Sequence, residues 1–101
     1  MASSISVVLR ASHADAFTLE VSVKEDRGET SHTVTLARRL LARLAPNESP
    51  EELVRQCFVF LLDREPKESI LRSFDVSVIG RYFPEFEGVI AMRQTSTGRP
   101  K

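Results

Sequence analysis

The sequence predicts an α+β fold: a small antiparallel β-sheet, made of a hairpin and an N-terminal strand, followed by three to five helices packed on one face. Two patterns support this prediction. Apolar residues alternate with polar ones from Phe17 to Leu36 around a turn at Gly28, and beyond Ala37 the apolar spacing becomes helical. The chain has 101 residues, 42% of them hydrophobic and 28% charged, which is typical of one globular domain.

The strands come first along the chain. Ile5, Val7 and Leu9 alternate with polar or smaller residues, which predicts a strand, and the polar segment 11–16 predicts a loop. In segments 17–24 and 31–36 the apolar residues again share one face. Gly28 can adopt the positive φ of a short hairpin loop between these two segments. Because the two apolar faces match, we expect an antiparallel pair with one side against helices.

Two helices are expected next. The leucines at 40, 41 and 44 recur at helical spacing and predict a short helix over 37–45, which Pro46 ends. Residues 49–52 then supply a serine N-cap, a proline at the first helical position and a glutamate three residues after the cap. The helix predicted over 50–64 is apolar on every side. It should therefore be central, with neighbours on more than one flank.

Shorter segments follow in the last third of the chain. Ile70, Leu71 and Phe74 predict the inner side of a helix of about two turns after Pro66, and residues 75–83 approach helical spacing again. Core candidates continue over 84–90. Residues 93–101 contain no apolar side chain and three positive charges, which predicts a disordered basic tail. The expected organisation is a single domain over 1–92 followed by this tail.

Composition argues against several classes of protein. Fourteen basic and fourteen acidic residues cancel, so no net field attracts nucleic acid or an anionic membrane. No apolar run approaches the roughly 20 residues that span a bilayer. The first six residues lack the features of a secretion signal, so we expect a cytoplasmic protein. Cys57, the only cysteine, excludes a disulfide within the chain and lies in an apolar run, which predicts a buried, unreactive thiol.

Histidines, the usual acid–base and metal-binding residues, are few. Ser12, His13 and Asp15 are neighbours in a predicted loop, where local hydrogen bonding explains them better than a catalytic triad does. His13 and Asp15 would supply only two metal ligands. His32 falls on the core face, which predicts a structural imidazole held by hydrogen bonds.

Other catalytic and cofactor signals are weak. Glu65, Glu68 and Glu85 lie near the densest apolar region, so an enzyme that uses a carboxylate pair stays an open alternative. The four glycines are scattered along the chain, and neither common phosphate-binding loop is present. We expect no cofactor and no metal.

Aromatic residues concentrate between Phe58 and Ile90, a stretch with five of the six phenylalanines and the only tyrosine. They form either the core or an exposed interface, since contiguous apolar patches on small proteins mark interaction surfaces. A homodimer would also cover the apolar helix expected over 50–64. The candidate interface residues are Phe58, Phe74, Tyr82, Phe83 and Phe86.

Two family resemblances bear on function. The stretch FLLDREPKESIL at 60–71, followed by Phe74, Ile79 and YFPE at 82–85, resembles a family of short bacterial proteins of uncharacterised function, over about residues 17–90. This resemblance implies a bacterial cytosolic protein and supplies no active site. The order of strand, Arg-rich helix and capped helix over 32–64 is similar to ribbon-helix-helix DNA-binding proteins.

The second resemblance implies dimerisation through the strand and contact with the major groove by Ser31, Thr33 and Thr35. Zero net charge and the glutamates that begin the second helix do not fit phosphate contact. We therefore expect a non-enzymatic interaction or regulatory protein with a protein partner or self-association. The alternatives are a DNA-binding regulator and a carboxylate-pair enzyme.

Overall fold

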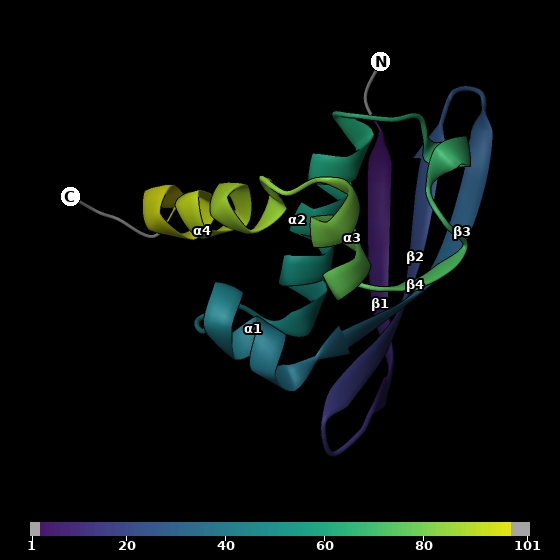
Figure 1. Cartoon of the computed structure of the whole chain (residues 1–101). Helices are drawn as coiled ribbons and strands as arrows, with labels where there is room; N and C mark the ends of the chain where they lie inside the picture. The colour runs from purple at the N-terminus through teal and green to yellow at the C-terminus, as the bar shows by residue number, and fades with distance from the viewer. Residues whose placement is uncertain (1–2, 98–101) are drawn as a thin grey trace.

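The computed structural model of the chain describes residues 3–97 and has the expected α+β architecture. Four strands form one sheet in the order β1-β2-β3-β4, and the four α-helices pack on one of its faces (Figure 1). No helix in the described range is long and apolar enough to cross a membrane. The elements are β1 (Ser4–Ser12), β2 (Ala16–Glu25), β3 (Gly28–Ala37), α1 (Arg38–Leu44), α2 (Pro50–Leu62), the 3-10 helix η1 (Lys67–Ser69), β4 (Ser73–Asp75), α3 (Ser77–Tyr82) and α4 (Phe86–Thr97).

The first three strands form an antiparallel meander. Its hairpin turn has Gly28 at φ 122°, the only positive φ among the described residues. The registers place Val7 opposite Val21 and Val21 opposite His32, so the alternating apolar side chains share one face. That face carries the helices, as the sequence predicts. β1 extends to Ser12, so the loop before β2 is shorter than the expected 11–16.

The fourth strand replaces a predicted helix. Ile70, Leu71 and Phe74 were expected on one side of a helix, but η1 is a single turn and β4 pairs with β3 in parallel. The backbone N–H of Thr33 donates to Arg72 O, and the N–H of Val76 donates to Thr35 O. These sheet hydrogen bonds outweigh the helical spacing of three apolar residues.

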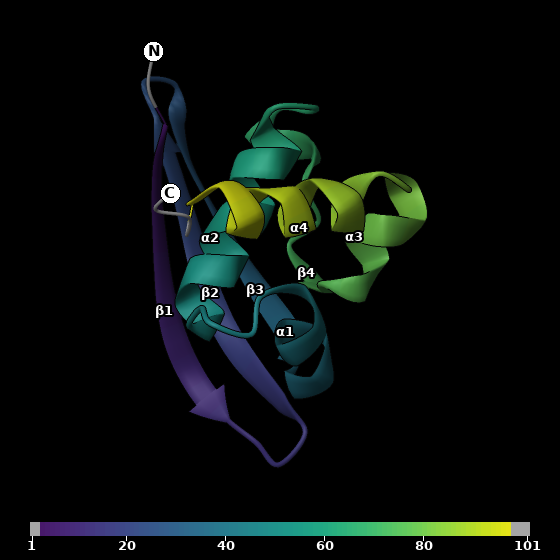
Figure 2. The same cartoon turned by 90° about the vertical axis from the view of Figure 1, so that its left-hand side faces the viewer.

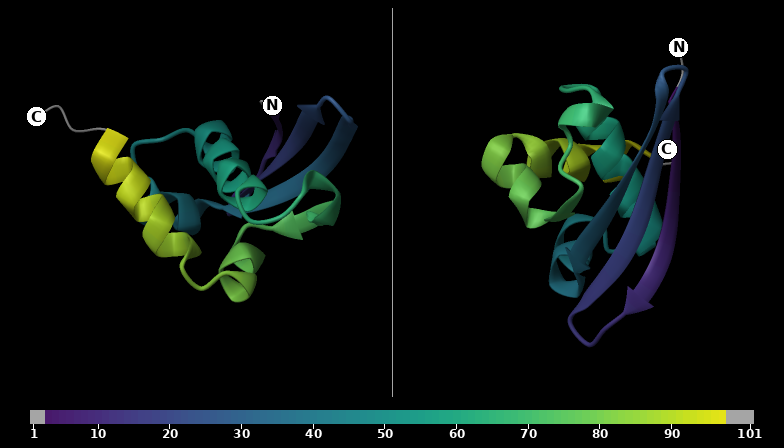
Figure 3. Two further views of the ribbon diagram at one scale, coloured as in Figure 1. Left: turned by 90° about the horizontal axis from the view of Figure 1, so that it is seen from above. Right: turned by 90° about the vertical axis from the view of Figure 1, so that its right-hand side faces the viewer.

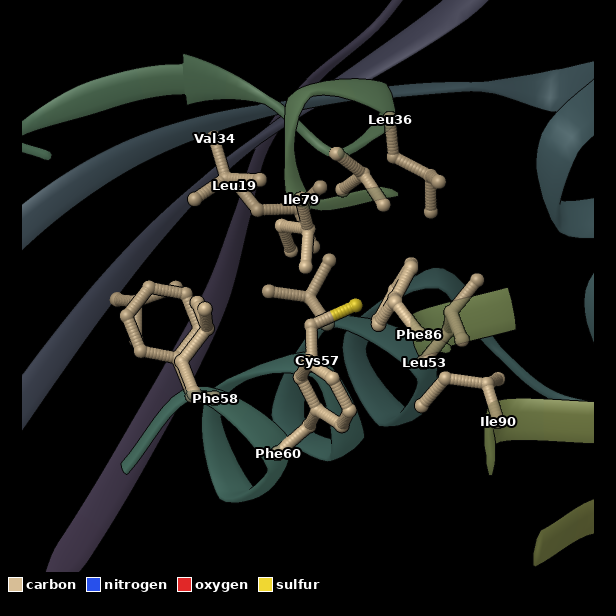
Figure 4. Close-up of a cluster of buried hydrophobic side chains, with 14 of the residues drawn as sticks. Leu19, Val34, Leu36, Leu53, Cys57, Phe58, Phe60, Ile79, Phe86 and Ile90 are labelled. Carbon is tan, nitrogen blue, oxygen red and sulfur yellow. The ribbon is translucent and has the colours of Figure 1, made fainter. Parts of the chain in front are cut away.

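Helix α2 is the centre of the molecule. Ser49 caps it, because its side chain accepts a hydrogen bond of 3.1 Å from the Glu52 N–H. Sheet residues of β1 and β3 contact α2 on one side, and α4 contacts it on the other (Figure 3). Cys57 and Phe58 of α2 have no exposed surface. Figure 4 shows the Cys57 sulfur directed from α2 into the buried cluster.

The last helix contains part of the expected tail. α4 continues to Thr97, so the structure describes residues 93–97 as helix, whereas residues 98–101 lie outside the described residues. Phe86 and Ile90 of α4 are buried against α2. Arg43 of α1 forms an ion pair of 2.7 Å with Glu87, which connects the first helix to the last.

Candidate functional site

A hollow in the surface lies between the end of α2, the segment 69–74 and α3. We call it the α3 groove; its volume is about 460 Å³. Eight of its ten residues are apolar or aromatic. Leu71 is 50% exposed and Tyr82 is 69% exposed, values far above those of the core. The groove is lined by Leu61, Glu65, Ser69, Ile70, Leu71, Phe74, Val78, Ile79, Tyr82 and Phe83.

The short helix α3 forms one wall of the α3 groove. Its start is stabilised by Asp75, whose Oδ1 accepts a hydrogen bond of 2.9 Å from the Ser77 N–H. Residues four apart lie on the same side of a helix, so Val78 and Tyr82 both border the groove. The helix ends at Tyr82, two residues before Pro84.

His32 holds the opposite wall of the α3 groove in place. Its ring is 2% exposed and lies 5.2 Å from the ring of Phe58. Nδ1 is 2.8 Å from Leu71 O, and Nε2 is 2.8 Å from Thr30 Oγ1. Because a carbonyl oxygen only accepts, Nδ1 must donate to Leu71, and Nε2 forms the second hydrogen bond with the Thr30 hydroxyl. The buried, hydrogen-bonded imidazole that the sequence predicts at His32 is confirmed.

The five candidate interface residues separate into two groups. Phe74, Tyr82 and Phe83 line the α3 groove. Phe58 and Phe86 are 0% and 1% exposed, so their assignment to an exposed interface is corrected: both are core residues. The difference follows from position, because these two face the sheet–helix interior from α2 and the start of α4.

Sequence reasoning missed two members of the groove, the exposed Leu71 and the partly buried Val78. The sequence predicts Leu71 on the buried side of a helix and indicates no role for Val78. Ser73, Phe74, Asp75 and Val76 alternate between polar and apolar, which is a strand pattern. Placing a strand there would have moved Leu71 out of the core.

Two of the three glutamates considered for catalysis are each paired with a basic side chain. A hydrogen bond from Lys67 Nζ, 2.7 Å from Oε2, lowers the pKa of the Glu68 carboxyl. Backbone hydrogen bonding and then Arg64, 3.0 Å away, lower the pKa of Glu85. Both carboxylates are therefore ionised at neutral pH and are poor proton donors. Glu65 borders the α3 groove with partial exposure.

Arg38 holds Ser12, at the end of β1, and His13, at the start of the following loop. Arg38 donates from Nη2 to Ser12 Oγ at 2.6 Å and from Nε to His13 O at 2.7 Å. Its guanidinium also lies 4.2 Å above the Phe17 ring. This guanidinium fixes the β1–β2 loop to the start of α1 through contacts that are distant along the chain. The local hydrogen bond of the turn runs from the His13 N–H to Ala16 O, at 2.8 Å.

Neither a metal cluster nor a reactive thiol is found among residues 3–97. No group of three or more His, Cys, Asp or Glu side chains could hold a metal ion there. Cys57 is fully buried, and burial raises the pKa of its thiol. The thiol is therefore protonated and inaccessible to reagents.

Fold and site together define a small α+β protein with an exposed apolar groove. No protein-family model, curated protein or solved structure matches the chain. The functional conclusion therefore depends on the groove.

Proposed function

We propose that the protein is a non-enzymatic interaction module that binds an apolar segment of a protein partner in the α3 groove. The observation that carries the proposal is the exposure of Leu71 and Tyr82, at 50% and 69%, beside a hollow lined mainly by apolar side chains. Apolar area removed from water contributes about 25 cal/mol per Å². Aromatic residues with one polar end are common at binding surfaces.

The lining of the groove specifies the chemistry of its partner. The volume of about 460 Å³ is within the range of roughly 300–1,000 Å³ that binding pockets occupy. Glu65 is the one charged residue in the lining. The occupant is a short segment with bulky apolar side chains and one lysine or arginine that pairs with Glu65.

Two alternatives have weaker support. A ribbon-helix-helix dimer needs a free edge on the strand after the hairpin, but β3 lies between β2 and β4. A carboxylate-pair enzyme needs one carboxyl group with a raised pKa, whereas the pKa values of Glu68 and Glu85 are lowered. The interaction module needs neither feature.

Peptide selection tests the proposal and does not require the natural partner. Peptides selected from a random library should share bulky apolar residues and a basic residue. Fluorescence anisotropy of a synthetic selected peptide then measures affinity for the protein and for Leu71→Ser and Tyr82→Ser, two changes at exposed positions. We expect each change to weaken binding by about tenfold or more, as for a central aromatic or apolar contact.

Met92→Ser is the matched control, because Met92 is 71% exposed on α4, away from the α3 groove. It should leave the affinity within about twofold. Glu65→Gln should weaken the binding of peptides that carry the basic residue. Equal affinity of Tyr82→Ser, Leu71→Ser and the unmodified protein for the selected peptides would show that the groove is not the binding site.

A further inference from the structure

The strand β1 forms one edge of the sheet. It pairs with β2 on one side, and no strand within residues 3–97 pairs with its other side, the open edge (Figure 2). The strand spans nine residues, contains no proline and has Arg10 as its only charge. Natural edge strands are normally protected by prolines, several charges or short length. This edge has little such protection and is suited to pairing with another strand.

The hydrogen-bond phase of the sheet determines which residues of β1 face the open edge. Thr33 and Thr35 bond toward β4, so odd-numbered residues of β3 point that way and even-numbered ones point to β2. In the β2–β3 register the even-numbered residues of β3 lie opposite odd-numbered residues of β2, so the even-numbered residues of β2 point to β1. In the β1–β2 register these lie opposite even-numbered residues of β1, up to the register shift after Leu9, so the even-numbered residues of β1 point to β2. The His13 N–H bond to Ala16 O at the β1–β2 turn has the same phase. The backbone groups of residues 5, 7 and 9 therefore point to the open edge.

The side chains of these same residues are incompletely covered. Ile5, Val7 and Leu9 lie on the helix face and are only partly buried against the core. A second groove, of about 520 Å³, lies beside Ile5. We call it the β1 groove; it is lined by Ser3, Ile5, Val59, Phe60, Leu62, Asp63, Arg64, Val89 and Arg93. An added strand would complete the hydrogen bonds and cover the apolar side chains together.

We propose that two copies of the chain associate through antiparallel pairing of β1 with β1, with Val7 of each copy opposite Val7 of the other. This register places Ile5 opposite Leu9 of the second copy. The three residues whose backbone groups point to the open edge, 5, 7 and 9, then each pair with one of the same three residues in the second copy. Each of these pairs exchanges two backbone hydrogen bonds. The register shift between Leu9 and Ala11 ends the regular ladder, which makes Val7 its centre.

A second copy fits this edge because the strand is complementary to itself. On the outer face, Ser6 lies opposite Val8 of the second copy and Ser4 opposite Arg10, so no like charges meet. The two-fold axis is perpendicular to the sheet, so both helix layers lie on one side, and the β1 groove of each copy lies beside Leu9 of the other. The α3 groove, beside β4 at the opposite edge, stays accessible.

Sedimentation velocity over a range of concentrations tests the existence of the dimer. The protein should reach twice its mass of 11.4 kDa as concentration rises. Val7→Pro should abolish dimerisation and keep the monomer fold by circular dichroism, because the lost N–H faces the open edge and proline is tolerated on edge strands. A monomer at every soluble concentration, or a dimer that persists in folded Val7→Pro, would overturn the proposal.

Two exposed positions test the register without depending on that variant. Ser6 and Val8 are exposed on the outer face. In the combination Ser6→Glu with Val8→Lys, opposite charges meet across the interface twice, whereas in Ser6→Lys with Val8→Lys like charges meet twice. We expect the first combination to dimerise more tightly than the second by roughly tenfold. Equal dissociation constants for two folded combinations would refute the Val7-centred pairing.

Discussion

Replacement of His32 by leucine should loosen the wall of the α3 groove and lower the stability of the whole domain. The change removes two hydrogen bonds of 2.8 Å, to Thr30 and Leu71, and the ring contact with Phe58. Each hydrogen bond contributes about 1 kcal/mol and the ring contact about 0.5–1 kcal/mol. The free energy of unfolding should therefore fall by about 2–3 kcal/mol, a large part of the roughly 5–15 kcal/mol typical of a domain.

Urea unfolding followed by circular dichroism gives this free energy, with Thr30→Val as the control. That control removes only one of the two hydrogen bonds and should cost about 1 kcal/mol. Amide hydrogen exchange locates the effect: protection of the Thr33 and Val76 amides, which bond across β3 and β4, should fall more than protection between β2 and β3. A loss below about 0.5 kcal/mol with unchanged protection would refute the role assigned to His32.

Three further predictions concern the cap, the ion pair of the buried Lys67 side chain and the core thiol. Ser49→Ala should lower the free energy of unfolding by about 1 kcal/mol in urea titrations, because the Glu52 N–H loses its acceptor. Lys67, with a 2% exposed side chain, pairs with Glu68, which raises the pKa of the lysine and lowers that of the glutamate. The difference in free energy of unfolding between the protein and Lys67→Met should therefore be largest between the ordinary pKa values of 4.5 and 10.5. It should shrink as the pH falls through the lowered pKa of Glu68 or rises through the raised pKa of Lys67. A pH-independent difference would contradict this prediction. Cys57 should react with a thiol reagent only as the protein unfolds, and rapid labelling of folded protein would contradict its burial.

The fold could be predicted where local pattern and tertiary contact agree. In β2 and β3 the alternation of apolar residues matches the face that the helices cover. At the start of α2, the serine, proline and glutamate of residues 49–52 specify a helix end through contacts within four residues. Such signals do not depend on distant parts of the chain.

β4 could not be predicted in the same way. Its alternation covers only residues 73–76, too few to outweigh the helical spacing of Ile70, Leu71 and Phe74 in the sequence. Its hydrogen bonds come from β3, which is distant along the chain. The error affects the site directly, because a helix there places Leu71 on its buried side, whereas Leu71 is exposed. Two of the five candidate interface residues are core residues instead, for a related reason: composition locates the aromatic cluster but does not separate buried Phe58 from the groove residue Tyr82.

The measurement that tests the proposed function most directly is a map of the contact surface in solution. A selected peptide would be titrated into ¹⁵N-labelled protein, and the amide shifts would be followed by NMR. We predict that shifts concentrate at Glu65 and across segment 69–83, which form the α3 groove. The amides of Thr18 and Ser22, on the uncovered face of the sheet, should stay in place. Shifts confined to that open face, or none in the α3 groove at saturation, would contradict the proposal.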